Sequence, residues 1–228
     1  NIGAIQTMIE VEFLGTGTST GVPQLGCECE VCKSSDPRDK RLRCSSIVRT
    51  QGVSLLIDCG PDFRQQMLRA SDLHLDALLI THSHYDHVGG MDDLRPYCRE
   101  TPFPVYAQPN VVADIKARIP YCFREHLYPG VPTFDMHPLT GKPFDVKGVR
   151  VEPLPVMHYK LPIFGYRIGN LAYITDAKTI PPSTMARLQG IDTLIINALR
   201  FKPHLSHMNL EETLAVVAKT KPRRALLI

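Results

Sequence analysis

The sequence has 228 residues, enough to bury a sizeable hydrophobic core in one large domain or two small ones. Hydrophobic residues make up 43% and charged residues 21% of the chain, the balance of an ordinary globular protein. A formal net charge of +3 is too small to indicate a nucleic-acid partner by itself, and no apolar stretch approaches the ~18 residues of a membrane span.

Strand and helix patterns alternate along the chain. Alternating or β-rich apolar stretches predict strands over residues 9–14, 46–49, 54–57, 77–80, 102–106, 149–155, 164–168, 171–174, 193–197 and 225–228. Helical patterns cover residues 61–70, 111–118 and 209–219, the last beginning with a capping-box spacing of Asn209 and Glu212. Residues 121–138 are aromatic, contain proline and predict an irregular segment. With no repeat and no linker, this order predicts one α/β domain of two mixed sheets covered by helices.

The seven cysteines are an odd number, which argues against a disulfide framework. Cys27, Cys29 and Cys32 lie within six residues, a spacing that suits a metal better than a disulfide. The other four are expected to be small buried hydrophobic residues: Cys44, Cys59, Cys98 and Cys122. Residues 1–8 lack the basic stretch and apolar core of a secretory signal, so a reducing cytoplasm is the expected location. The charged segment 33–43 predicts a solvated surface rather than an RNA-binding face.

The apolar strand over residues 77–80 leads directly into a cluster of possible metal ligands. Three of the nine histidines and one aspartate lie within six residues: His82, His84, Asp86 and His87. Imidazole nitrogens and a carboxylate suit zinc, manganese or iron. On an extended segment His82 and His84 point the same way, whereas Asp86 and His87 lie beyond a bend and can serve a second metal. The spacing therefore predicts a two-metal site at the end of a strand.

The run Thr81-His82-Ser83-His84-Tyr85-Asp86-His87 resembles the HxHxDH signature of the metallo-β-lactamase superfamily. Further short motifs are similar to those of the same superfamily and occur in the same order: residues 13–17, 56–60, Met157-His158 with Gly165-Tyr166, and Thr175-Asp176. The resemblance extends over nearly the whole chain. It implies an αββα sandwich, in which two mixed β-sheets are flanked by helices and the active site lies along one edge of the sheets.

Within this superfamily the chain resembles the PhnP-type phosphodiesterases, which hydrolyse cyclic phosphoribosyl phosphates. The similar segments are Gly21-Val22-Pro23, the cysteine cluster and residues 206–210. In that group three cysteines and a C-terminal histidine hold a structural zinc. The resemblance therefore implies Cys27, Cys29 and Cys32 as ligands of one structural zinc ion. Since tetrahedral zinc needs four ligands, the fourth must come from elsewhere in the sequence.

The resemblance also implies which residues hold the two active-site metals. His82, His84 and His158 would bind one ion. Asp86 and His87 would bind the other, and Asp176 would bridge the two.

Two further residues have roles by resemblance. Asp58 is similar to the family's aspartate that accepts the free N–H of a ligating imidazole, with a simple strand-end cap as the alternative. His207, in a Ser-His-x-x-Leu pattern, resembles the catalytic histidine and would protonate the leaving group as a general acid. The expected catalytic residues are therefore His207 and Asp86.

The end of the chain departs from the family pattern. In the family, further histidines for the second metal and for the structural zinc follow the last strand, whereas no histidine follows His207 here. Residues 225–228 resemble residues 77–80, the strand that delivers the first histidines. We therefore expect one metallo-β-lactamase-like hydrolase domain over residues 1–228 that lacks its C-terminal end.

The expected activity is hydrolysis of a small cyclic phosphate ester, of the phosphoribosyl cyclic phosphate or 2′,3′-cyclic nucleotide type. Two divalent ions, zinc or manganese, would activate a hydroxide and stabilise the leaving oxygen. The expected partner is the small phosphate ester, with nucleic acid only as a possible substrate and no membrane. The expected assembly is a homodimer.

Two other classes of function stay open. A ribonuclease Z-like nuclease shares the HxHxDH run and a late histidine, but the three-cysteine cluster is unexpected there; a thioesterase or lactonase of the superfamily is a weaker form of this alternative. A non-enzymatic zinc-binding module would use the cysteine cluster to contact a partner. Metal content distinguishes the classes, because a module needs one zinc and the hydrolase two further ions.

Overall fold

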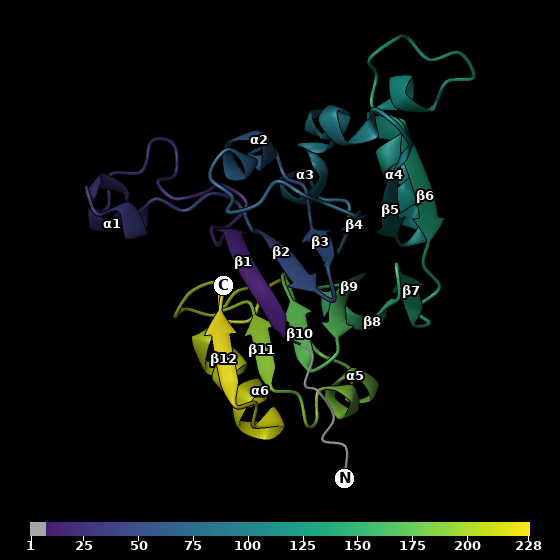
Figure 1. Cartoon of the computed structure of the whole chain (residues 1–228). Coiled ribbons are helices and arrows are strands. Elements are labelled where there is room, and N and C mark those ends of the chain that lie inside the picture. Colours follow the sequence, from purple (N-terminus) through teal and green to yellow (C-terminus); the bar gives the residue numbers. More distant parts are fainter. Residues whose placement is uncertain (1–7) are drawn as a thin grey trace.

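The computed structural model describes residues 8–228, which form two six-stranded β-sheets with helices on their outer faces (Figure 1). The predicted absence of a secretory signal rests mainly on residues 1–7, which lie outside the described part. Within residues 8–228, no helix has the length and apolar character needed to cross a membrane.

The first sheet follows the chain in order, from β1 to β6. Its strands are β1 (Ile9–Gly15), β2 (Ser45–Thr50), β3 (Val53–Ile57), β4 (Ala77–Leu79), β5 (Phe103–Ala107) and β6 (Phe134–Pro138). The first three strands pair antiparallel, and β3 to β6 pair parallel. Parallel pairing brings the carboxyl ends of β3 and β4 to the same edge of the sheet.

The second sheet has the order β12-β11-β10-β9-β8-β7. Its strands are β7 (Phe144–Val146), β8 (Val149–His158), β9 (Leu161–Ile168), β10 (Leu171–Ile174), β11 (Thr193–Ile196) and β12 (Arg224–Leu227). The strands from β7 to β10 pair antiparallel, and β10, β11 and β12 pair parallel. Both sheets are therefore mixed, as predicted.

Short helices connect the strands. The α-helices are α1 (Glu30–Lys33), α2 (Phe63–Met67), α3 (Tyr85–Val88), α4 (Pro109–Arg118), α5 (Pro182–Arg187) and α6 (Leu210–Thr220), and the 3₁₀ helices are η1 (Pro37–Asp39), η2 (Met91–Cys98) and η3 (Pro120–Phe123). The predicted capping box begins α6, since the Asn209 side chain accepts from the Glu212 backbone and the Glu212 side chain accepts from the Asn209 backbone. The loop that carries α1 extends away from the sheets (Figure 1).

The core explains the layered arrangement. Leu55 and Ile57 of β3 pack with Val151 and Tyr166 of the second sheet, whereas Leu56, between them in sequence, belongs to the cluster on the opposite face under the helices. This alternation follows from the period of two along a strand. A third cluster lies beneath α5 and α6 on the outer face of the second sheet. The result is the predicted αββα sandwich.

The prediction of an irregular segment over residues 121–138 is wrong. That segment contains the end of η3 and the whole of β6, which pairs with β5. Strand β6 lies at the edge of its sheet, where Phe134 and Met136 pack against the core and alternate with polar Asp135 and His137. The strand therefore carried a short period-two signal, which the sequence analysis overlooked within an aromatic, proline-containing segment. Strand β7 and helix α5 were also missed.

Candidate active site

The predicted site residues follow the ends of four strands from both sheets. Asp58 comes directly after β3, and the His82 to His87 run follows β4. His158 is the last residue of β8, and Asp176 follows β10. The HxHxDH run itself turns from extended backbone at His84 into the short helix α3, whose first turn carries Asp86 and His87. Tertiary structure thus brings together residues that lie far apart in sequence.

The first group of possible ligands comprises His82, His84 and His158. Each offers a ring nitrogen, and these nitrogens lie within 4.8 Å of one another. His82 is 1% exposed, and its Nε2 is buried with no hydrogen-bond partner among the described residues. An unpaired buried nitrogen is costly unless something binds it. A metal ion held by the three ring nitrogens would satisfy His82 Nε2. The three histidines therefore fit the ligand set predicted for one metal ion.

The second group comprises His82, His87 and Asp176, again with ligand atoms within 4.8 Å of one another. Asp176 Oδ2 lies 2.9 Å from His87 Nε2 and 3.5 Å from His82 Nε2, the residue that the two groups share. Asp86 belongs to neither group, but its Oδ2 is 3.3 Å from His87 Nε2. The structure therefore brings all six predicted ligands close together.

Hydrogen bonds determine which ring nitrogen of His87 is available. Asp58 is fully buried, and its Oδ2 lies 2.7 Å from His87 Nδ1. The same carboxylate accepts hydrogen bonds from the backbone N–H and the hydroxyl of Thr81, each at 2.8 Å. With Asp58 as the acceptor, Nδ1 carries the proton and Nε2 points to Asp86 and Asp176 as a possible metal ligand. This geometry matches the orienting role expected of Asp58.

The same reasoning applies to His82 and His158. The single proton of the Thr81 hydroxyl is donated to Asp58, so this hydroxyl accepts from His82 Nδ1 at 3.0 Å. His158 Nδ1 lies 2.8 Å from the carbonyl of Asp176 and 3.0 Å from that of Ser206, and carbonyls only accept. Both rings therefore leave Nε2 unprotonated. Sequence reasoning missed Thr81, although a hydroxyl at the strand end directly before the first histidine was a usable signal.

The charges around the cluster shift its pKa values in opposite directions. Burial lowers the pKa of His82 well below its usual value, and neighbouring His87 adds to this effect. Burial also opposes charge on His87, but the carboxylates of Asp58 and Asp176 outweigh it and hold the pKa of His87 well above its usual range. Burial raises the pKa of Asp176, but His87 outweighs this and keeps that carboxyl ionised. A metal ion on His87 Nε2 must therefore displace a proton.

The cluster opens into a cavity of about 700 Å³, hereafter the catalytic cavity. His84, His87, His158 and Asp176 line it together with His207. His207 Nδ1 is 3.7 Å from Asp176 Oδ1, and its ring centroid is 4.7 Å from that of His158. Burial lowers the pKa of His207, although Asp176 partly opposes the shift. The predicted general acid thus faces the same cavity as the metal-donor groups.

Three further histidines belong to neither metal-donor group. The ring centroid of His204 is 5.0 Å from that of His207, but His204 does not line the catalytic cavity. His74 pairs with Asp76, and His137 stacks on Tyr106 with ring centroids 4.5 Å apart.

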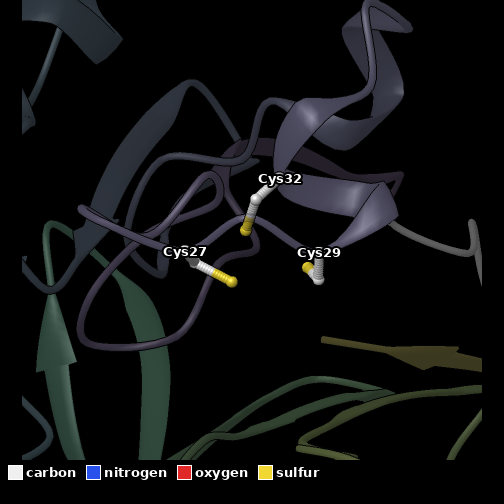
Figure 2. Close-up of side chains that lie close together, drawn as sticks. All are labelled: Cys27, Cys29 and Cys32. Carbon is white, nitrogen blue, oxygen red and sulfur yellow. The ribbon is translucent and has the colours of Figure 1, made fainter.

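The cysteine cluster forms a separate group of possible ligands on the loop around α1. The sulfurs of Cys27, Cys29 and Cys32 lie within 4.8 Å of one another and point toward a common space (Figure 2). Within residues 8–228 no fourth histidine, cysteine or carboxylate joins them. Of the other thiols, Cys59 and Cys122 are buried as expected, whereas Cys44 and Cys98 are half-buried.

Comparisons with known proteins agree with this geometry. The family model described as a beta-lactamase superfamily domain matches residues 54–228. An octanoyltransferase of Porphyromonas gingivalis is 46% identical over 219 residues; the alignment covers 95% of this chain and 44% of that protein, so the chain spans less than half of its length. A ribonuclease Z of Mycobacterium sp. strain KMS is 27% identical over 214 residues, which are 85% of this chain and 70% of the relative.

A solved structure of a diphosphatase from the PhnP family superposes with a TM-score of 0.89 and 37% identity, covering 96% of this chain and 86% of that one. The family match covers more than half of the chain and includes every residue of the two metal-donor groups. This chain therefore belongs to the beta-lactamase superfamily, and its fold and sequence resemble the PhnP family within it.

Proposed function

We propose that this protein is a metal-dependent phosphodiesterase that cleaves small cyclic phosphate esters, of the phosphoribosyl cyclic phosphate or 2′,3′-cyclic nucleotide type. The observation that carries the proposal is the convergence of two metal-donor groups, sharing His82, on a cavity that His207 also lines. The 37% identity to a PhnP-family diphosphatase supports a substrate that carries phosphate. We assign this activity to one hydrolase domain.

In this proposal His82, His84 and His158 hold one divalent ion, Asp86 and His87 hold the other, and Asp176 contacts both. When bound, zinc or manganese supplies Lewis acidity that activates water at neutral pH and stabilises charge on phosphate oxygens. Asp58 and Thr81 fix the protons on His87 and His82, so that the Nε2 atoms face the ions. The three cysteines hold a structural zinc outside the catalytic cavity.

His207 is the proposed general acid. Its ring lies beside Asp176 and His158, within reach of a substrate that contacts both metal-donor groups. A protonated imidazole at this place donates its proton to the departing alkoxide as the P–O bond breaks. A ribose hydroxyl is a poor leaving group and needs this proton, whereas p-nitrophenolate leaves without it.

The test compares two substrates, 2′,3′-cyclic AMP and bis-p-nitrophenyl phosphate, with added zinc or manganese. We expect both to be cleaved, and His207→Ala to slow cleavage of the cyclic nucleotide by about 100-fold or more while slowing the nitrophenyl ester much less. His137→Ala, a histidine of β6 outside the catalytic cavity, is the matched control. No cleavage of either ester by the metal-loaded wild type contradicts the proposal, and equal slowing of both contradicts the role of His207.

A ribonuclease Z-like nuclease is the second candidate, favoured by the 27% identity to the mycobacterial relative over most of both chains. Cleavage of a precursor tRNA at its 3′ side, faster than that of cyclic nucleotides, would support it. A non-enzymatic module that binds one zinc ion through its cysteines does not account for the two metal-donor groups that share His82. Metal content near three ions per chain supports the hydrolase, and one ion supports the module. A homodimer remains a prediction, which light scattering tests.

A further inference from the structure

A second cavity, of about 490 Å³, adjoins the catalytic cavity, and four basic residues line it. We call it the basic groove and define it by Arg38, Lys40, Arg41, Arg69 and Gln66. It lies between the end of β1, the loop through η1 and helix α2. Thr16 and Arg41 line both cavities, so one ligand can extend from the catalytic cavity into the groove.

The positive charge of the groove is largely uncompensated. Arg38 is paired with Asp36 at 2.6 Å, but Lys40, Arg41 and Arg69 form no ion pair with any of residues 8–228. The single carboxylate that lines the groove, Glu12, is engaged by Arg49 at 2.8 Å and by Ser71. Arg41 Nε donates to the carbonyl of Arg38 at 3.2 Å, but this contact leaves its charge uncompensated. Three cations without an ion pair among the described residues, all lining one groove, favour an anionic ligand.

Gln66 forms part of the wall of the groove. Its side chain is 1% exposed, and its Nε2 donates to the carbonyl of Arg43 at 2.8 Å. Its Oε1 is buried with no donor among the described residues, and an atom that solvent does not reach is not available to a ligand in the groove. The exposed cations, and not Gln66, therefore favour an anionic ligand.

We propose that the basic groove binds a second phosphate group of the substrate while the scissile phosphate lies in the catalytic cavity. The identity of the reaction rests on the proposed function, but the binding of a second phosphate does not. Two sources offer this chemistry: the 5′-phosphate of the same nucleotide, or the next phosphodiester of a short oligoribonucleotide.

The experiment measures dissociation constants by calorimetry on the metal-loaded chain, with ligands that carry a 3′-phosphate and therefore resemble reaction products. Adenosine 3′-phosphate has no second phosphate. Adenosine 3′,5′-bisphosphate adds one on the same nucleotide, and the dinucleotide ApAp adds one between two nucleotides. We expect one of the two to bind about tenfold more tightly than adenosine 3′-phosphate, because two exposed ion pairs contribute at most about this much.

The groove variant is Lys40→Gln with Arg69→Gln, since both side chains are exposed and neither lines the catalytic cavity. It should lose the tenfold gain and keep the wild-type affinity for adenosine 3′-phosphate. The matched control, Lys142→Gln with Arg150→Gln, removes two exposed charges around the β7–β8 hairpin and should keep the gain. The gain should also shrink as salt rises.

The outcomes separate the two claims. Failure to hydrolyse any cyclic phosphate, with the groove-dependent gain intact, overturns the proposed function and leaves the phosphate-binding groove standing. Equal wild-type affinity for all three ligands, or a gain that the groove variant retains, overturns the groove. Whichever ligand shows the gain identifies the source of the second phosphate.

Discussion

Replacing Asp58 with asparagine tests whether the fold fixes the protonation of a metal-binding histidine. In the wild type, the Asp58 carboxylate accepts from His87 Nδ1 at 2.7 Å and twice from Thr81. An asparagine can keep its oxygen on the Thr81 backbone N–H, but its N–H₂ group then replaces the oxygen that accepts from both His87 and the Thr81 hydroxyl, and an N–H₂ group only donates. The ring must then accept at Nδ1 and carry its proton on Nε2, the nitrogen that faces Asp86 and Asp176.

The expected loss can be worked out from that single bond. A hydrogen bond to a charged group contributes about 1.5–3 kcal/mol, which corresponds to roughly 10- to 100-fold in an equilibrium constant. Loss of an outer hydrogen-bond partner of a ligating histidine costs the same range in metal affinity. We therefore expect Asp58→Asn to bind zinc about 10- to 100-fold more weakly than the wild type, measured by competition with a chromophoric chelator.

The control for this prediction is Asp76→Asn. Asp76 is also a buried aspartate that accepts from a backbone N–H, that of Ser54 at 2.8 Å, but it lies at the opposite end of β4 from the histidines. Both variants should lower the free energy of unfolding, and only Asp58→Asn should lower metal affinity. If Asp58→Asn loses stability yet binds zinc as tightly as the wild type, Asp58 is a strand-end cap and the reasoning about the tautomer is wrong.

Three further predictions concern stability and the shape of the site. Burial raises the pKa of Asp76, but Lys147 and the Ser54 N–H outweigh this effect and lower that pKa below its usual value. The ionised carboxylate therefore stabilises the fold above about pH 4, and this contribution is lost as the pH falls further. The difference in unfolding free energy between wild type and Asp76→Asn should shrink from about pH 5 to pH 3 in urea titrations. Asn209→Ala removes the side chain that caps α6 and should cost about 1 kcal/mol in the same titrations at neutral pH; no loss would show that the cap is redundant. Gly60→Ala should lower metal content measured by mass spectrometry, because the added Cβ would lie 2.0 Å from the carbonyl oxygen of Asp86 and displace that segment; unchanged content would contradict the close packing.

The sequence was informative about the site where ligands are close together in the chain. The spacing of His82, His84, Asp86 and His87 predicts a two-metal site from residue chemistry alone, and the structure brings these side chains together. His158 and Asp176 could be assigned only by family resemblance. Nothing in their local sequence shows that β8 and β10 end opposite β4, because that depends on how two sheets pack. The edge strand β6 was missed although Phe134 and Met136 alternate with polar residues, because five residues next to an irregular, proline-containing stretch give only a short signal.

Only part of the hydrogen bonding that orients the histidines could be predicted from the sequence: the family resemblance gave the role of Asp58, whereas the acceptors for His82 and His158 were missed. His87, His82 and His158 each direct Nδ1 to a different acceptor, namely a carboxylate, a hydroxyl and a pair of backbone carbonyls. The acceptors belong to four separate parts of the chain: Asp58, Thr81, Asp176 and Ser206. The two backbone carbonyls leave no trace in the residue types, so no motif records them. His84 differs, because its ring forms no hydrogen bond with any of residues 8–228 and it lines the open catalytic cavity. Hydrogen bonds therefore hold three of the candidate ligand rings in place, those of His82, His87 and His158, whereas no such bond from the described residues holds the ring of His84.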